Sequence, residues 1–166
     1  MSTPKQPPKS LRADARAVVD TCAGWNVRLA ARRITQFLER EMAASGSLGV
    51  AQLGLMAQIA VASDDTISAL ARRTGLDQST LSRNLRTLEA DGLVEIAMVE
   101  ADQRRRMVWL TETGARRLEA AIPVWRRVHA KLARRLSVDL ARRLALEADA
   151  LAQDVSERAK EAVRVG

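Results

Sequence analysis

Residues 67–93 read ISALARRTGLDQSTLSRNLRTLEADGL, and this segment predicts two short helices joined by a tight turn. Gly75 is placed to end the first helix, because glycine is the usual residue just past a helix C-terminus. Asp77 can cap the second helix, which is expected over residues 78–90 and is stopped by Gly92. Leucines recur at helical spacing in the second helix, so it has one apolar stripe and one polar face. The segment therefore predicts a helix-turn-helix unit.

The polar face of the second predicted helix carries two kinds of side chain. Its serines are short enough to let the helix approach a surface closely, and its longer side chains can reach the base edges or phosphates of DNA. These residues are Gln78, Ser79, Ser82, Arg83 and Arg86. An apolar stripe that packs on the domain, opposite a polar face that fits a major groove, is typical of a DNA-reading helix.

Two strand-like runs follow the helices, at residues 93–99 and 107–110. The segment between them, residues 100–106, is charged and ends in three successive arginines. This pattern predicts a β-hairpin with a long basic tip, which could lie along phosphates or enter the narrow, electronegative minor groove. Because a hairpin after a helix-turn-helix is the order of a winged helix-turn-helix, we expect a mainly α fold with a small β-hairpin wing.

The composition favours a nucleic-acid partner. The chain has 166 residues, a formal net charge of +7 and a pI near 10.8, and 23 of its 27 basic residues are arginine. Arginine suits phosphates and guanine edges, so DNA is the first hypothesis and a membrane surface the second. Aromatic residues make up only 2%, which argues against a single-strand binder that needs stacking platforms.

Several other classes of protein lack support in the sequence. Apolar residues make up 47%, enough for a core, yet no apolar run approaches the roughly 18 residues that would span a membrane. No secretory signal opens the chain, and one cysteine with one histidine provides neither a disulfide nor a zinc site. No Gly-rich phosphate loop or catalytic triad is present. We therefore expect a cytoplasmic protein that is not an enzyme and binds no cofactor or metal.

Long helical segments flank the predicted winged unit of residues 46–110. Residues 1–10 are polar and Pro-rich, and we expect a disordered arm there. From residue 11 to residue 44 two apolar stripes run at helical spacing, which predicts one long helix held from two sides. Residues 111–136 and 140–163 are predicted to be helical for the same reason.

Separate short motifs occur in a defined order along the chain. They are Ile67-Ser-Ala-Leu70-Ala71, Gly75-Leu76, Ser79-Thr-Leu81-Ser82-Arg83, Leu88-Glu89, Gly92-Leu93-Val94, Asp102-Gln-Arg104, Leu110-Thr111 and Gly114. In this order and spacing they resemble the motifs of the MarR family of bacterial transcriptional regulators, over about residues 25–140. The resemblance implies a homodimer in which residues 11–45 and 111–163 form the helical dimerisation region. Each winged domain would then read one half-site of a near-palindromic operator.

The resemblance also assigns DNA contacts residue by residue. The recognition-helix face of the family corresponds to Ser79, Thr80, Ser82, Arg83 and Arg86, beside Gln78. The wing motif of the family corresponds to Asp102 and Arg104, where the arginine reaches the minor groove and the aspartate orients it. We include the neighbouring Arg105 in the predicted wing contact.

The resemblance further implies that DNA is released by a small phenolic or aromatic acid, or by oxidation of a cysteine. Trp25 and Trp125 are candidates for the effector site, although large rings at helical spacing more often belong to a core. Arg28 and Arg32 lie four residues apart and could neutralise an acid, or could equally pair with glutamates of the last helix. Cys22 could be a redox sensor or a small hydrophobe. The peroxide-sensing branch of the family supports its cysteine with tyrosines, which this chain lacks.

Taken together, these patterns predict a homodimeric, sequence-specific, DNA-binding transcriptional regulator. We expect a repressor that a small aromatic or phenolic effector releases from double-stranded DNA, with no membrane partner. Two alternatives stay open, namely a redox-sensing regulator that acts through Cys22 and a non-specific architectural DNA-binding protein.

Overall fold

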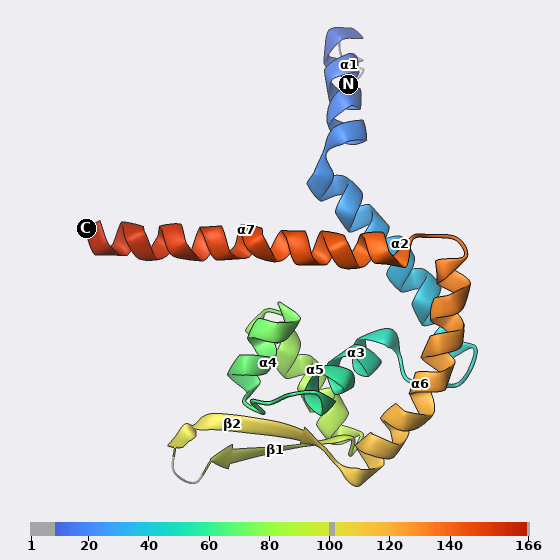
Figure 1. The fold of residues 1–166 in the computed structure, drawn as a ribbon, viewed down its shortest axis with the longest axis vertical. Coiled ribbons are helices and arrows are strands. Elements are labelled where there is room, and N and C mark those ends of the chain that lie inside the picture. The colour runs from blue at the N-terminus through green and yellow to red at the C-terminus, as the bar shows by residue number, and fades with distance from the viewer. Residues whose placement is uncertain (1–8, 100–101, 166) are drawn as a thin grey trace, which may run out of the picture. The chain divides into compact units, whose positions relative to one another are not determined.

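The computed structural model describes residues 9–99 and 102–165, with the backbone alone described at residues 99, 102–105 and 152–165. The chain separates into two compact units, Met1–Val124 and Trp125–Gly166, and the boundary falls inside one helix. The described helices and strands, labelled in Figure 1, are α1 (Lys9–Thr21), α2 (Ala23–Ala43), α3 (Val50–Ala60), α4 (Ile67–Thr74), α5 (Gln78–Ala90), β1 (Val94–Val99), β2 (Asp102–Leu110), α6 (Glu112–Ala133) and α7 (Val138–Val165).

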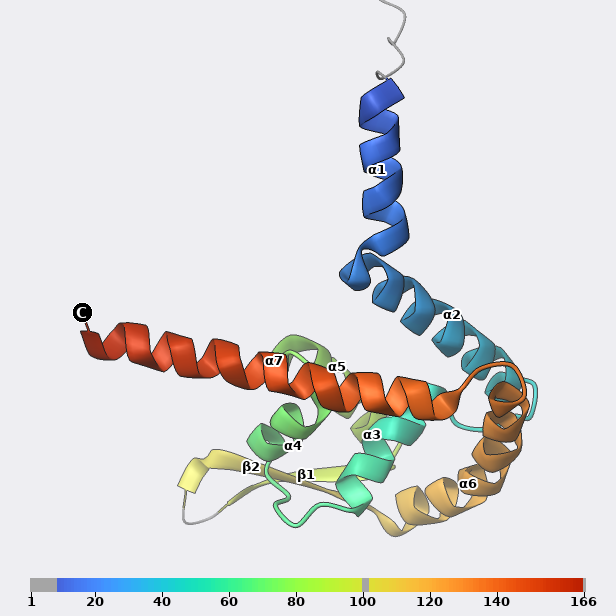
Figure 2. The ribbon, with the colours of Figure 1, turned by 45° about the horizontal axis from the view of Figure 1, so that its top comes forward.

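Helices α3, α4 and α5 lie together on one side of the β1–β2 ribbon (Figure 1, Figure 2). Helices α3 and α4 pack against β2, and α5 packs against β1. The strands are antiparallel, with Val94 opposite Leu110 and Ile96 opposite Val108. The predicted mainly helical fold with a small β-hairpin after a helix-turn-helix is thereby confirmed.

The core of this first unit is built from the apolar stripes of the short helices. Leu81, Leu85 and Leu88 of α5 are each at most 1% exposed, as predicted from their spacing. Met56 of α3 and Leu70 of α4 are fully buried as well. Each such side chain contributes about 1.5–3 kcal/mol by leaving water, so these few contacts hold the three helices in place.

The caps confirm the predicted end of α4 at Gly75 and the predicted start of α5 at Asp77. The buried Thr66 Oγ1 accepts a hydrogen bond from the Ala69 N–H at 3.2 Å and starts α4. Gly75 ends α4 with φ of +63°, a conformation that costs glycine nothing because it has no Cβ. The Asp77 side chain accepts the Thr80 N–H at 2.8 Å and starts α5.

A short extended segment before α4 joins the β-ribbon. Thr66 forms an isolated antiparallel bridge with Met107, and the Val108 N–H donates to the Asp65 carbonyl oxygen at 2.9 Å. The sequence did not predict this bridge, because one bridged residue is too short to show the alternation of a strand. The bridge ties the start of the helix-turn-helix to the hairpin.

The single long helix predicted over residues 11–44 is wrong. The structure divides it into α1 and α2 at Cys22, which is extended with φ of −65° and ψ of 105°. The Asn26 amide donates to the Asp20 carbonyl oxygen at 3.1 Å and replaces a helical bond lost at the break. Gly24, which lowers helix propensity, follows two residues after Cys22. Since only one residue leaves the helix, the apolar spacing continues across it and concealed the break.

The loop of the hairpin is also shorter than predicted. Strand β2 begins at Asp102, so most of the predicted tip at residues 100–106 is strand, and residues 100 and 101 lie outside the described part. An exposed two-stranded ribbon tolerates charged side chains, so the charge run did not mark a loop. Of the arm predicted at residues 1–10, residues 1–8 lie outside the described part, and Lys9 and Ser10 open α1.

The end of the hairpin is locked to the start of α6. The Thr111 N–H donates to the Leu93 carbonyl oxygen at 3.1 Å, and Thr111 Oγ1 donates to the Gly92 carbonyl oxygen at 2.7 Å. The Gly114 N–H in turn donates to Thr111 Oγ1 at 2.9 Å. Gly114 is buried, and a Cβ at this position would overlap the Leu93 carbonyl oxygen. Only glycine therefore lets α6 start so close to the hairpin.

We expect Gly114→Ala to lower the free energy of unfolding by about 1–3 kcal/mol or more, because backbone, not a flexible side chain, must move. Urea unfolding followed by circular dichroism measures the change. Gly54→Ala is the matched control: Gly54 lies exposed within α3 with nothing near its would-be Cβ, so alanine should raise stability by about 0.5–1 kcal/mol. Equal effects of the two substitutions would contradict the tight junction.

Candidate nucleic-acid interface

Helix α5 presents the predicted contact residues on its outer side. Gln78, Ser79, Arg83 and Arg86 are exposed, and Ser82 and Thr80 are half-buried. Burial of the leucine stripe fixes this orientation, because a helix that buries one side turns the opposite side to solvent. The structure therefore brings together the six α5 residues that the sequence predicted for DNA contact.

The N-terminus of α5 carries a compact hydrogen-bond network around Asp77. Ser79 Oγ donates to Asp77 Oδ1 at 2.6 Å, and Thr80 Oγ1 donates to Asp77 Oδ2 at 2.7 Å. The Thr80 N–H also donates to Asp77 Oδ1 at 2.8 Å, which is the capping bond of the helix. Both carboxylate oxygens of Asp77 therefore accept hydrogen bonds, and Asp77 orients two of the predicted contact residues, Ser79 and Thr80.

These hydrogen bonds stabilise the charged form of the carboxylate. The Ser79 hydroxyl, followed by the Thr80 N–H and the Thr80 hydroxyl, holds the pKa of Asp77 well below its usual range. Asp77 is consequently ionised under all ordinary conditions, and it can act only as a hydrogen-bond acceptor.

The basic residues of α4 differ in how firmly they are held. Arg73 donates to the Asp64 carbonyl oxygen at 3.1 Å and to the Gln58 carbonyl oxygen at 3.5 Å, which ties it to its own domain. Arg72 is exposed on the same helix. Arg73 is thus a structural residue, whereas the arginines of α5 point outward.

The wing residues stand in a strand, not in a loop. Asp102, Arg104 and Arg105 belong to β2, and their side chains lie outside the described part of the chain. Their neighbour Arg106 is exposed and pairs across the ribbon with Met98, which is 65% exposed. The described end of the ribbon therefore carries an exposed cation beside an exposed apolar side chain.

Three of the predicted effector residues line one surface depression on α2. Trp25, Arg28 and Arg32, together with Leu29, surround a volume of about 50 Å³, and the Trp25 side chain is 53% exposed. Trp125 belongs to the second unit, where its ring contacts His129 with centroids 4.9 Å apart. Cys22 is exposed at the N-cap of α2.

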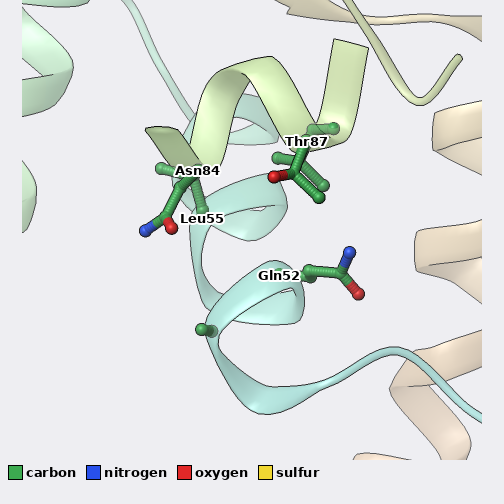
Figure 3. Close-up of a pocket in the computed structure, with 6 residues that line it drawn as sticks. Gln52, Leu55, Asn84 and Thr87 are labelled. Carbon is green, nitrogen blue, oxygen red and sulfur yellow. The ribbon is translucent and has the colours of Figure 1, made fainter. Parts of the chain in front are cut away.

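Two further hollows were not predicted from the sequence. One lies where α3 meets the back of α5, and Figure 3 shows Gln52, Leu55, Asn84 and Thr87 around it, with a volume of about 70 Å³. The other, about 190 Å³, lies between the loop after α2 and the first half of α6, beside Arg117. Both are formed by residues distant in sequence, which leave no periodic signal.

Comparison with known proteins places these features among transcriptional regulators. The MarR family model matches residues 47–105. A crystal structure of the transcriptional regulator MosR of M. tuberculosis in complex with DNA is similar, with a TM-score of 0.70 and 33% identity. That likeness covers 81% of this chain and 98% of MosR.

Curated relatives match over shorter stretches. The transcriptional regulator HosA of Escherichia coli is 37% identical over 82 residues, which is 43% of this chain and 61% of HosA. The phenylalanine–tRNA ligase alpha subunit of Pyrococcus horikoshii is 36% identical over 76 residues, which is 46% of this chain but 14% of the ligase subunit. The chain therefore spans less than two thirds of the length of each of these curated relatives. The similarity to the ligase subunit is confined to a small part of that protein.

The sequence assigned Asp77 only a capping role, whereas the structure shows that it also orients two of the predicted contact residues. Its spacing to Ser79 and Thr80 was visible, and an aspartate two and three residues before hydroxyl side chains is the signal that could have identified the network. The cap of α4 differs in this respect, because Thr66 Oγ1 accepts a backbone N–H, that of Ala69.

We expect Asp77→Ala to lower the melting temperature at neutral pH, because α5 loses its cap and two hydroxyls lose their acceptor. The pKa of Asp77 is lower in the folded chain than its ordinary value of 3.8. The ionised carboxylate therefore stabilises the fold fully at pH values well above 3.8, and this stabilisation is lost as the pH falls below 3.8 toward the folded-state pKa. The difference in melting temperature between wild type and variant should therefore shrink in acid. A difference that is constant from pH 7 down to pH about 3 would contradict an ionised cap.

Proposed function

The chain belongs to the MarR family, and we propose that it is a transcriptional regulator that binds double-stranded DNA as a homodimer. The single observation that carries the proposal is the exposed outer face of α5, with Arg83 and Arg86 opposite a fully buried leucine stripe. Such a helix can enter a major groove without disturbing the core behind it. Family membership also supports the expectation that the protein is not an enzyme.

The two parts of the proposed interface have different tasks. Arg83 and Arg86 on α5 are long enough to reach base edges, where arginine pairs with guanine. Arg104 and Arg105, with Asp102 beside them, supply the contact of the wing to the minor groove or the phosphates. Exposed Arg106 adds charge at the described end of the same strand.

The proposal is tested with a duplex recovered by footprinting the purified protein on genomic DNA. Arg83→Ala should relax base choice and cost about 1–3 kcal/mol on that duplex, but little on a scrambled one. Arg104→Ala is the contrasting variant, because it should weaken binding to all duplexes and reduce the slope of log affinity against log salt by about 0.9. Equal affinity of wild type for the recovered and scrambled duplexes at fixed salt would favour the architectural alternative.

The homodimer is supported by apolar side chains that a single chain leaves in solvent. They occur on α1, on α2 and on α7: Leu11, Val18, Val19, Trp25, Val27, Leu140, Leu144 and Leu151. On α7 the spacing of Leu140, Leu144 and Leu151 places them on one side of the helix. A second copy that supplies the same stripe can cover it, since a two-fold interface is self-complementary.

We expect Leu144→Glu to weaken dimerisation by at least about tenfold, because each copy loses about 1.5–3 kcal/mol of apolar burial. Sedimentation velocity over a range of concentrations measures the shift toward monomer. Ala145→Glu is the control, since it adds the same charge on the same exposed helix away from the leucine stripe. Loss of the dimer in both variants alike would mean that the stripe is not the interface.

A small aromatic or phenolic effector completes the proposal, with the protein as a repressor. The depression lined by Trp25, Arg28 and Arg32 offers a ring and two cations to an acid. Its volume of about 50 Å³ is far below the roughly 300–1,000 Å³ of enclosed ligand sites, so an effector there needs further walls from the second copy. The redox alternative rests on Cys22. A redox-sensing thiol must be accessible to solvent and must have positive charge nearby, and the exposed Cys22 meets the first requirement.

A further inference from the structure

The hydroxyl proton of Ser79 is committed within the protein. Ser79 Oγ lies 2.6 Å from Asp77 Oδ1, and Asp77 is ionised. A carboxylate has no hydrogen to give, so the serine must be the donor in this bond. A distance this short is typical of a charge-assisted hydrogen bond, which is roughly twice as strong as a neutral one. Releasing the proton to another acceptor would therefore cost more than breaking a neutral hydrogen bond.

Thr80 fixes the carboxylate from its other side. Thr80 Oγ1 donates to Oδ2 at 2.7 Å while the Thr80 N–H donates to Oδ1, so the carboxylate cannot rotate without breaking several bonds. Thr80 is half-buried, whereas Ser79 is exposed. Thr80 is thus a positioning residue, and Ser79 is the hydroxyl that faces outward with only its lone pairs free.

The bases in a major groove differ in what they offer such a group. Adenine presents an N6 amino donor and cytosine an N4 amino donor, whereas guanine N7 and O6, thymine O4 and phosphate oxygens are all acceptors. A serine with a free proton can bond to either kind, so it normally discriminates little. A serine that can only accept has no bond to make with guanine, thymine or a phosphate.

We infer that Asp77 restricts the Ser79 hydroxyl to accepting hydrogen bonds from DNA, so that Ser79 selects an adenine or cytosine amino group in the major groove. Ser79 is the second residue of α5, and the N-terminal residues of a recognition helix are those that reach base edges. The charge of Asp77 acts in the same direction, since it attracts amino hydrogens and repels phosphates. The inference rests on the proposed function, because α5 must enter the groove.

The test uses the full chain and the duplex recovered by footprinting. Each adenine in turn is replaced by purine, which lacks the N6 amino group, and each cytosine by a pyrimidin-2-one, which lacks the N4 amino group. For wild type, one replacement in each half-site should weaken binding about 5- to 150-fold, and its position tells adenine from cytosine. For Ser79→Ala the same replacement should have no effect on affinity. Damage to the base pair itself affects both proteins equally, so the comparison isolates the contact.

Two further variants test the cause. Ser68→Ala removes an exposed serine at the second position of α4, which matches the place of Ser79 in α5, and should leave the penalty of the replacement intact. Asp77→Gly removes the carboxylate that accepts the Ser79 proton, while glycine remains a tolerated residue at a helix N-cap, so the Ser79 hydroxyl becomes free to donate. In this variant thymine or guanine should become tolerated at the position that Ser79 reads.

Each outcome decides between the inference and its premise. A penalty in wild type that disappears in Ser79→Ala, with relaxed choice in Asp77→Gly, supports the inference. Specific binding by wild type with equal penalties in wild type and Ser79→Ala overturns the inference while the proposed function stands. Unchanged base choice in a folded Asp77→Gly removes Asp77 from the role. Absence of any sequence preference in wild type ends the proposed function, and the inference with it.

Discussion

Burial of one leucine stripe on α5 is the constraint on which the interface depends. Leu81, Leu85 and Leu88 are at most 1% exposed, and a helix has only one rotation about its axis that buries all three. That rotation turns Arg83 and Arg86 to solvent together. The energy that positions the polar face is therefore hydrophobic, and the polar residues themselves contribute little to holding the helix in place.

The hairpin is held to the same core by two sets of hydrogen bonds toward its base. Met107 and Val108 pair with the segment before α4, and just beyond the end of β2 the Thr111 side chain joins the Gly92 carbonyl oxygen to the first turn of α6. Gly114 permits this close approach because any Cβ would meet the Leu93 backbone. A ribbon of two strands has little stability alone, so these attachments are what make it a defined arm.

In the proposed interface, the carboxylate of Asp77 links the stability of α5 to recognition. Its bond to the Thr80 N–H satisfies an N–H that the helix start would otherwise leave unpaired, and its bonds to the two hydroxyls decide which atoms of Ser79 remain available. A cap placed at the N-terminus of a recognition helix lies next to the residues that reach bases. In the proposed interface, helix capping and base choice are therefore coupled at this position.

The sequence by itself determined the elements whose signals are local. The cap at Asp77, the glycine at position 75 and the leucine spacing of α5 predicted the helix-turn-helix, because each acts within a few turns of helix. It also predicted that six candidate contact residues share one side of α5, since a common side follows from helical period alone. Tertiary structure decided what local spacing cannot express. The helix breaks at Cys22 although the apolar residues keep their helical spacing in the sequence across this position. The start of β2 at Asp102 depends on pairing between the two strands. The direction of the Ser79 hydroxyl depends on where Asp77 places its carboxylate oxygens. Each of these depends on a partner group whose position the folded backbone sets.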